Sequence, residues 1–522
     1  MNRKEFVMKK IISILLCVTL ILCTLAPLAH AQSDECNCGE TPLIYVGPLG
    51  STSIYLNPDT DEEVQLFRLT TDTVLKLVGG ILPALVLLGI TRNYDAFGDS
   101  VIKVINETMG MLALDGDGNS FENVSAKREM PTGTEHGKGT DYYFSYDWRL
   151  SPIEVAGQLK EFVEEVKRLT GHDTVNFKAS SMGGVVTMSY FYKYGYSDVE
   201  ACVFQCCPLQ GTSLAGELLC RQITFNARAL YEYGIQAYPP VDFEGVLLNT
   251  LFDFIYYSGL ADAVLGVGDK LLEELHDKIF EELLTPVFGT ILGLWSFVPD
   301  CYYEEARAIN LDPKTQAGLI AKADEYHYQV QQRADEILTG AVESGMRVMI
   351  VAGYNIRTTP ILPDTMDCHS DCTVDTCYAS AGATVCDIYE TFPEGYVQAV
   401  NDGHNHVSPD GAIDASTCIL PEYTWFIKDM LHSNGQPGID GLYDNVLYPE
   451  NDEPFTVWSD PNYTQFLQND KPNSRVIPMG NFAPGAEAPE IEEGKAFYDF
   501  FKKWIAPVEN TVFKVLDFVR GE

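Results

Sequence analysis

Positively charged residues are scarce in this chain of 522 residues. It contains 35 Lys and Arg against 74 Asp and Glu, which gives a formal net charge of −39 at pH 7. A chain this acidic repels nucleic acid and anionic lipid headgroups at long range. We therefore expect no nucleic-acid partner. The 46% of hydrophobic residues is ordinary for a globular protein with a buried core.

Long apolar runs are also few, and the run at the N-terminus is too short to cross a membrane. Residues 11–25 are almost continuously apolar, whereas a membrane-spanning helix needs ~20 such residues. Lys9 and Lys10 precede the run, and Ala29-His30-Ala31 supplies the small residues that signal peptidase recognises. The pattern predicts a signal peptide over residues 1–31 and a secreted mature protein. An uncleaved membrane anchor is the alternative.

Cysteine is not scarce, and its number indicates an oxidising compartment. Of the fourteen Cys, two fall within the predicted signal peptide, which leaves twelve (14 − 2). An even number in an exported protein favours disulfides. Four of them cluster around His369 in one loop-like stretch: Cys368, Cys372, Cys377 and Cys386. A zinc site is the alternative, but no CxxC pair is present. We therefore predict disulfides and no metal.

Short apolar runs alternate with amphipathic stretches in the first half of the mature chain. The runs predict strands at residues 42–46, 142–146, 175–178 and 201–205. Helical periodicity occupies the intervals at residues 151–169 and 182–194. An order of strand, helix, strand, helix and strand predicts a mostly parallel, doubly wound α/β sheet with helices on both faces.

The pattern changes after residue 212. Apolar helical stripes dominate until about residue 339, and a buried strand returns at residues 347–352. We expect a helical insertion within the α/β domain. The predicted organisation is a signal peptide, an N-terminal core part, a helical cap, a C-terminal core part and a C-terminal extension, at residues 1–31, 32–212, 213–345, 346–435 and 436–522.

A candidate nucleophile stands between a predicted strand and a predicted helix. A serine held on such a sharp turn needs small residues two positions to either side, because the neighbouring backbone approaches closely. Ser181 meets this requirement with Ala179 and Gly183. Ser180 does not, because bulky residues stand at both of those positions. We therefore predict Ser181 as the nucleophile.

An oxyanion formed at such a serine needs backbone N–H donors. The amide of Met182 opens the following helix, whose N-terminal N–H groups and dipole favour negative charge. A second donor is expected from the Gly-rich turn at residues 47–51, which follows the first strand. Pro48 has no N–H, so we predict Leu49.

Three motifs together carry a family resemblance. They are Tyr146-Asp147-Trp148-Arg149-Leu150, Ser181-Met182-Gly183-Gly184 and Pro208-Leu209-Gln210-Gly211-Thr212-Ser213. In this combination the chain resembles the lecithin–cholesterol acyltransferase-like branch of the α/β-hydrolases, which includes phospholipases and acyltransferases. The resemblance covers residues 42–213 and, less closely, 347–432. It implies an α/β-hydrolase fold with a cap that carries the acyl-binding surface. The Trp148-Arg149 pair we interpret as structural.

The resemblance also implies where the acid and the base of a catalytic triad lie. In that family the acid belongs to a Gly-Asp-Gly-Thr-Val-like motif, and the histidine follows some thirty residues later. Asn401-Asp402-Gly403 matches the start of the motif. His432 follows at that spacing, near the end of a predicted helix. We therefore predict Asp402 and His432. His404 and His406 are competing bases, and four carboxylates compete as the acid: Asp364, Asp367, Asp410 and Asp414.

These residues predict a secreted serine hydrolase that cleaves lipid-type acyl esters without a cofactor. The apolar stretch at residues 284–298 would line the acyl site, contact a lipid interface transiently, or pack within the cap. The alternatives are an O-acyltransferase with the same triad, a serine peptidase or small-ester esterase, and a catalytically inactive binding module. Covalent labelling by a fluorophosphonate separates the enzymes from the inactive module.

Overall fold

The computed structural model describes most of the mature chain. The described residues are 40–67, 93–121, 123–224, 226–237, 275–432, 438–451, 453–470 and 475–480, with isolated positions 38, 84, 87, 91, 253 and 256. The predicted signal peptide lies outside them. Within these ranges, no helix is both long enough and apolar enough to cross a membrane.

A mostly parallel sheet of eight strands forms the centre of the molecule, in the order β15-β14-β13-β8-β7-β6-β1-β5. All neighbouring strands run parallel except β14 and β15. The predicted mixed α/β architecture with a mostly parallel sheet is confirmed. The strands are β1 (Leu43–Val46), β5 (Asp141–Phe144), β6 (Val175–Ser180), β7 (Val199–Gln205), β8 (Arg347–Tyr354), β13 (Thr424–Lys428), β14 (Phe466–Asp470) and β15 (Arg475–Pro478).

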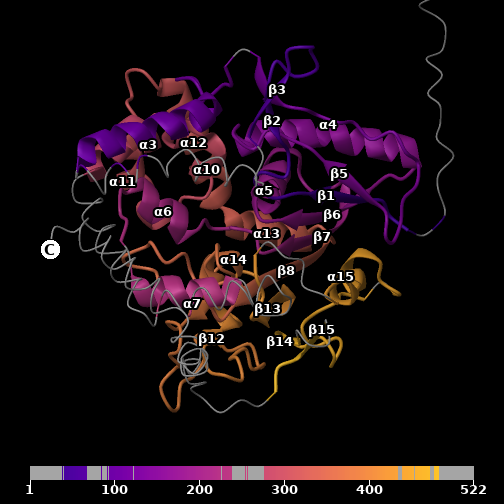
Figure 1. Ribbon diagram of the computed structural model, residues 1–522. Helices are drawn as coiled ribbons and strands as arrows, with labels where there is room; N and C mark the ends of the chain where they lie inside the picture. The colour runs from indigo at the N-terminus through magenta and orange to yellow at the C-terminus, as the bar shows by residue number, and fades with distance from the viewer. Residues whose placement is uncertain are drawn as a thin grey trace, which may run out of the picture.

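Helices cover both faces of this sheet. On one face lie α4 (Pro152–Thr170), α5 (Met182–Tyr194) and α13 (Ala334–Glu343), which share one apolar core, and on the other lies α15 (Asp440–Leu447). Figure 1 shows α4 and α5 above β1 and β6. Alternate residues of β7 pack toward opposite sides. Phe204 belongs to the apolar core beneath α4 and α5, whereas Val203 belongs to a second core with α15. Burial on both faces explains why the central strands read as continuous apolar runs.

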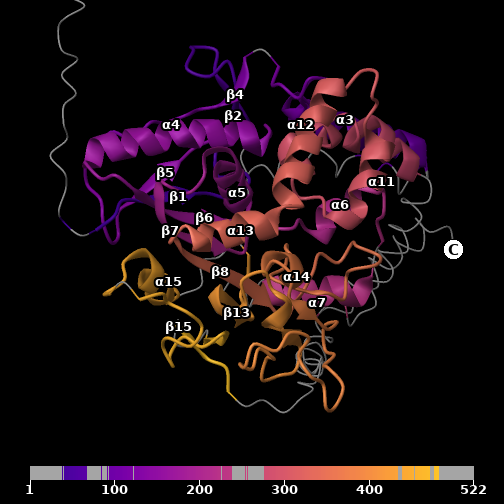
Figure 2. The ribbon, with the colours of Figure 1, turned by 180° about the vertical axis from the view of Figure 1, so that it is seen from behind.

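Every element that the structure describes between β7 and β8 is a helix. This part of the chain contains α6 (Ser213–Leu219), α7 (Ala227–Ala237), α10 (Leu292–Trp295), α11 (Asp300–Asn310) and α12 (Ala317–Tyr326), besides α13. Figures 1 and 2 show α6, α11 and α12 beside α3 (Tyr94–Met109), to one side of the sheet. These helices bury their own apolar core around Trp295 and Tyr303.

Short antiparallel pairs surround the main sheet. β2 (Ile54–Leu56) pairs with β3 (Val64–Phe67) and with β4 (Val124–Ala126). β9 (Ile356–Arg357) pairs with β10 (His369–Ser370), and β11 (Thr384–Val385) pairs with β12 (Ile413–Asp414). β10 bears on function, because it brings the following loop toward the end of β8.

The helix expected before His432 is wrong, because residues 424–428 form strand β13. All five residues of β13 are buried, including Trp425, Phe426 and Ile427. Parallel neighbours on both sides and apolar layers on both faces favour consecutive apolar residues in a strand. The strand delivers the histidine to the end of the sheet.

The predicted disulfides are not formed by the described cysteines. Eleven of the twelve Cys of the mature chain are described, and all eleven carry free thiols. In the 368–386 cluster, the Cys386 thiol approaches the Gly411 carbonyl, and Cys372 is buried. Burial raises the pKa of the Cys368 thiol to about 12 and that of Cys372 to about 11. The thiols of Cys368 and Cys372 are therefore protonated at neutral pH in the chain as described.

The Trp148-Arg149 block has the structural role that the sequence indicated. Arg149 is fully buried, and its guanidinium donates to both carboxylate oxygens of Asp147 at 2.9 and 2.6 Å. It also donates to the carbonyls of Leu112 and Val124. A buried arginine is stable only when its donors are satisfied. Arg149 therefore holds the backbone at Leu112 and Val124 against the segment that follows β5.

Candidate active site

Ser181 lies on a strained turn between β6 and α5. Its backbone has φ 53° and ψ −121°, a conformation that costs free energy for a residue with a Cβ. A Cβ at Gly183 would stand 1.9 Å from the Val46 carbonyl oxygen, and one at Gly184 would stand 2.5 Å from the Cys207 sulfur. Only glycine fits these two positions. The glycine two positions after Ser181 is thus required by the close approach of α5 to β1.

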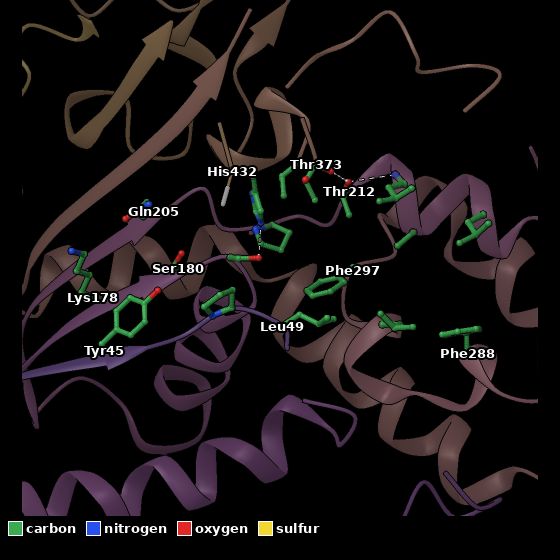
Figure 3. A pocket seen from close by; sticks show the side chains of 18 of the residues that line it. Tyr45, Leu49, Lys178, Ser180, Gln205, Thr212, Phe288, Phe297, Thr373 and His432 are labelled. Carbon is green, nitrogen blue, oxygen red and sulfur yellow. Dashed lines mark hydrogen bonds between the residues drawn. The ribbon is translucent and has the colours of Figure 1, made fainter. Parts of the chain in front are cut away.

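His432 faces this serine. It follows β13, and its Nε2 lies 2.9 Å from the Ser181 Oγ, as the dashed line in Figure 3 shows. The two residues are 251 positions apart in the sequence. The structure therefore brings together the predicted nucleophile and the predicted base.

Asp371 stands behind the histidine. Its Oδ2 lies 2.8 Å from His432 Nδ1, and its backbone carbonyl accepts from the His432 amide at 2.8 Å. The other carboxylate oxygen accepts from the amides of Thr373 and Val374 at 3.0 and 2.8 Å. The carboxylate therefore accepts the Nδ1–H and leaves the Nε2 lone pair toward the serine.

A glycine makes room for this acid. A Cβ on Gly353, at the end of β8, would lie 2.8 Å from the Asp371 Cβ and 2.6 Å from the Met430 carbonyl oxygen. The loop after β10 and the chain after β13 therefore meet directly over the end of β8. This contact sets the separation between Asp371 and His432.

Asp402, the predicted acid, lies elsewhere. Its Oδ2 bonds to His406 Nε2 at 2.9 Å, and its Oδ1 accepts from the His404 amide. The competing histidines also have other contacts: His406 Nδ1 meets Gln465, and the His404 ring stacks on Trp458. The carboxylate that contacts His432 is therefore Asp371 and not the predicted Asp402. A histidine four residues away captures the Asp402 carboxylate locally, so the loop closes on itself.

The sequence carried a weak signal for Asp371. Two strands, β7 and β8, lie between the nucleophile strand β6 and the histidine strand β13, and a carboxylate after either of them could reach the histidine. Asp371 comes seventeen residues after the end of β8 (371 − 354), inside the cysteine-rich stretch. Because the cysteines of this stretch favour a disulfide or zinc loop, the pattern does not single out the Asp371 carboxylate.

The two predicted oxyanion donors adjoin the nucleophile. Met182 is the first residue of α5, directly after Ser181. Leu49 belongs to the turn after β1 and lines the same cavity as Ser181. Two bonds hold this turn: the Tyr146 hydroxyl donates to the Gly47 carbonyl at 2.6 Å, and the Ser51 amide donates to the Pro48 carbonyl at 3.1 Å.

The Asp371 carboxylate raises the pKa of His432. Burial alone would lower the pKa of His432, but the adjacent Asp371 carboxylate outweighs burial and raises that pKa above its ordinary value of 6.5. An imidazolium formed during proton transfer is therefore stabilised where it arises.

A cavity of about 810 Å³ opens beside Ser181 and His432. Figure 3 shows Phe288, Phe297 and Leu49 on one side of the histidine, and Tyr45, Lys178 and Gln205 on the other. The first side is apolar, and α6 adds further leucines to it: Leu214, Leu218 and Leu219. The second side carries hydroxyl, ammonium and amide groups. The cavity thus has an apolar end and a polar end, with the serine between them.

The apolar stretch at residues 284–298 divides between two environments. Ile291, Trp295 and Val298 are at most 1% exposed and pack inside the molecule. Phe288, Leu294 and Phe297 line the cavity. The stretch therefore belongs partly to the core and partly to the cavity wall.

A buried carboxylate ties the start of α6 to the loop that carries the acid. Asp375 accepts from the Ser213 amide at 2.8 Å, and the neighbouring Thr212 hydroxyl donates to the Thr373 carbonyl at 2.8 Å. Burial raises the pKa of Asp375 to about 6. The apolar end of the cavity and the acid loop are thereby joined.

Two groups of described residues could place three ligand atoms around a metal ion. One consists of Cys206, Asp371 and His432, which belong to the arrangement just described. The other consists of Cys38, His136 and His172, far from the serine in the fold.

No protein-family model matches this sequence, and no curated protein sequence matches it. Among solved structures, a chain from "The crystal structure of Tle4-Tli4 complex" aligns with 60% of this chain and 75% of its own length, at 12% identity and a TM-score of 0.23. A likeness at that TM-score carries no argument about function. Any assignment of function therefore rests on the geometry of the site.

Proposed function

We propose that this protein is a serine hydrolase of the α/β-hydrolase fold that cleaves acyl esters. The observation that carries the proposal is the hydrogen-bonded series Ser181, His432 and Asp371, with Ser181 on a strained turn. A nucleophile, a base within hydrogen-bonding distance and an acid that orients the base are what acyl transfer through serine requires.

The proposed reaction has two halves. The Ser181 Oγ attacks the ester carbonyl carbon while His432 Nε2 takes the hydroxyl proton. The resulting oxyanion accepts hydrogen bonds from the amides of Leu49 and Met182. The intermediate then expels the alcohol, which receives the proton from His432, and an acyl-serine remains. Water attacks this ester through the same steps and releases the acid. Asp371 keeps the imidazole in the required tautomer throughout.

The substrate we propose is an amphiphilic lipid ester. The apolar end of the cavity, with Phe288, Leu294 and Phe297, suits an acyl chain. The polar end, with Tyr45, Lys178 and Gln205, suits the alcohol part of such an ester. An acyl chain gains roughly 0.8 kcal/mol for each CH₂ that leaves water, so long chains should be preferred.

Membership of the lecithin–cholesterol acyltransferase-like branch, export through the predicted signal peptide and the division into a core and a helical cap are parts of the same proposal. Within the predicted extension at residues 436–522, by contrast, α15, β14 and β15 belong to the central sheet and its core. The three motifs of the resemblance support the branch. Residues 1–31 support export. The helical chain between β7 and β8 supports the cap at residues 213–345.

A fluorophosphonate probe tests the proposal directly, because it reacts with an activated serine. The wild-type protein should be labelled on Ser181 and should hydrolyse nitrophenyl esters. Ser181→Ala should lose labelling and roughly 10⁴–10⁶ in rate. Ser180→Ala is the matched control and should retain both. Labelling that survives in Ser181→Ala would refute the assignment.

The same assay separates hydrolysis from acyl transfer. Incubation with a phospholipid and a long-chain alcohol should release free fatty acid. Formation of a new ester in place of the acid would assign the acyltransferase alternative, with the same three residues.

A further inference from the structure

Three ligand-type side chains meet at the edge of the sheet opposite Ser181. Cys38 precedes β1, His136 precedes β5, and His172 lies in the turn between α4 and β6. β1, β5 and β6 are parallel neighbours, so the residues just before them lie at one edge. Segments 98 and 134 residues apart from Cys38 are thereby brought to one point.

The ligand atoms face one another closely. The Cys38 Sγ lies 3.2 Å from His136 Nε2 and 3.4 Å from His172 Nε2, and the two Nε2 atoms are 3.1 Å apart. The rings are steeply tilted, with centroids 4.7 Å apart and planes at 76°. The Nε2 atom is thus the ring atom of each histidine that approaches the Cys38 sulfur.

These separations match a tetrahedral metal ion. With Zn–S near 2.3 Å and Zn–N near 2.0–2.1 Å, a tetrahedral site places two nitrogens about 3.3 Å apart and sulfur about 3.5 Å from each nitrogen. The observed triangle is smaller by only a few tenths of an ångström. Cysteine sulfur and histidine nitrogen are both ligand atoms that zinc accepts.

The second shell of the cluster favours metal binding. His136 Nδ1 lies 2.9 Å from the Thr134 carbonyl, which can only accept, so Nδ1 carries the proton. In neutral His136 the Nε2 lone pair therefore faces the common point. A bond from Nδ1–H to a backbone carbonyl is the usual way in which proteins orient a metal-binding histidine. The Glu40 amide lies 3.4 Å from the Cys38 Sγ, where it can donate to a thiolate.

We propose that Cys38, His136 and His172 bind one zinc ion, with water completing the tetrahedron. Cys38 is exposed and both histidines are half-buried, so solvent can reach the fourth position. One thiolate and two neutral imidazoles leave a net charge of +1 on the complex. The Glu40 carboxylate, which accepts from the Lys138 amide beside His136, compensates this charge.

The ion would act as a structural crosslink. It joins the segment before β1 to the loop before β5 and to the end of α4, and it lies at the edge of the sheet that Ser181 does not occupy. Metal binding to a preformed three-residue site stabilises the folded chain over the unfolded one. The site therefore affects unfolding rather than ester hydrolysis.

Metal stoichiometry tests this site. The mature protein, stripped by a chelator and then given Zn²⁺ alone, should retain one ion per chain after gel filtration. Co²⁺ in its place should give a thiolate-to-metal charge-transfer band and the intense visible bands of tetrahedral cobalt. Stripping should lower Tm, and Zn²⁺ should restore it.

Matched variants locate the ion. Cys38→Ser, His136→Ala and His172→Ala should each weaken Zn²⁺ binding at least tenfold and lose the response of Tm to the chelator. The removal of a single ligand leaves only two. Cys301→Ser, another exposed thiol, and His276→Ala should bind as the wild type does. Near-UV circular dichroism checks that each variant is folded.

Two results would overturn the site. One is a wild-type protein that keeps no Zn²⁺ or Co²⁺, with Cys38 oxidised or freely titratable. The other is unchanged binding in Cys38→Ser. If a ligand variant does not fold, protection of the Cys38 thiol from alkylation by Zn²⁺ in the wild type decides instead. Equal alkylation with and without Zn²⁺ refutes the proposal.

Discussion

The two edges of the central sheet gather different residues. At the edge where the parallel strands end, Ser181, Asp371 and His432 meet. At the edge where β1, β5 and β6 begin, Cys38, His136 and His172 meet. In both cases a parallel sheet brings together residues that are distant in the sequence, because all strand ends of one kind lie along one edge.

The edges differ in burial and in backbone strain. Ser181 is 8% exposed, Asp371 is fully buried, and the serine holds a positive φ. Cys38 is exposed and both histidines beside it are half-buried. Backbone strain and burial of polar groups cost free energy. A structural crosslink requires neither of them, whereas proton transfer is favoured by groups that are held in fixed positions away from water. This difference is consistent with ester hydrolysis at the edge that holds Ser181 and with a metal crosslink at the edge that holds Cys38.

Among the substitutions that test this comparison, we expect one at Asp371 to have the largest effect on ester hydrolysis. Asp371→Asn should lower kcat roughly 10⁴-fold, because the amide cannot hold the same histidine tautomer. Asp402→Asn is the matched control and should be mild, since that carboxylate contacts only its own loop. Steady-state ester hydrolysis measures both. The reverse ranking would restore Asp402 as the acid.

The pH profile should shift next. Hydrolysis needs neutral His432, so kcat/KM should fall as the pH drops through a pKa that Asp371 holds above 6.5. In Asp371→Asn, burial dominates and lowers this pKa, so the acid limb of the residual activity should move to lower pH. Profiles of the two proteins test this. An unmoved limb in the variant would separate Asp371 from the titrating base.

A smaller effect concerns the apolar end of the cavity. Leu294→Asn should lower kcat/KM roughly tenfold for long-chain esters and much less for short ones, because only long chains reach this wall. Met111→Asn changes an exposed apolar residue and serves as the control. Equal loss on both chain lengths would mean that Leu294 acts through packing alone.

The smallest expected effect on hydrolysis comes from the opposite edge. Cys38→Ser should change kcat by no more than about a factor of two, as distant and independent sites usually do, while Tm loses its response to a chelator. Parallel measurements of rate and melting temperature compare the edges directly. A large fall in kcat without unfolding would show that the two edges are coupled.

Much of the sheet could be predicted from the sequence, because its central strands are buried on both faces. The runs at residues 42–46, 175–178 and 201–205 fall within or overlap β1, β6 and β7. The same property misled at β13, where nine mostly apolar residues before His432 suited a helix equally well. Apolar runs without alternation do not distinguish a buried strand from a buried helix.

The site could be predicted where local backbone geometry constrains it. Ser181 is recognisable because Gly183 must be small, and that requirement is visible in the sequence. His432 was reached through a spacing. Asp371 was not reached, because its place depends on how the loop after β10 folds over Gly353. Contacts between distant segments leave no local sequence pattern. The Asn401-Asp402-Gly403 match therefore favours Asp402, although Asp371 is the carboxylate that contacts His432.

The separation of Ser181 from His432 by 251 residues governs when the site becomes complete during folding. The site is complete only when β8 and β13 have joined β6 and β7 in the sheet, because Asp371 follows β8 and His432 follows β13. Contacts between residues so far apart form slowly, because the intervening chain must first lose its conformational freedom. A partly folded chain thus carries a serine on its turn with no base beside it. Catalytic competence becomes a late reporter of native topology.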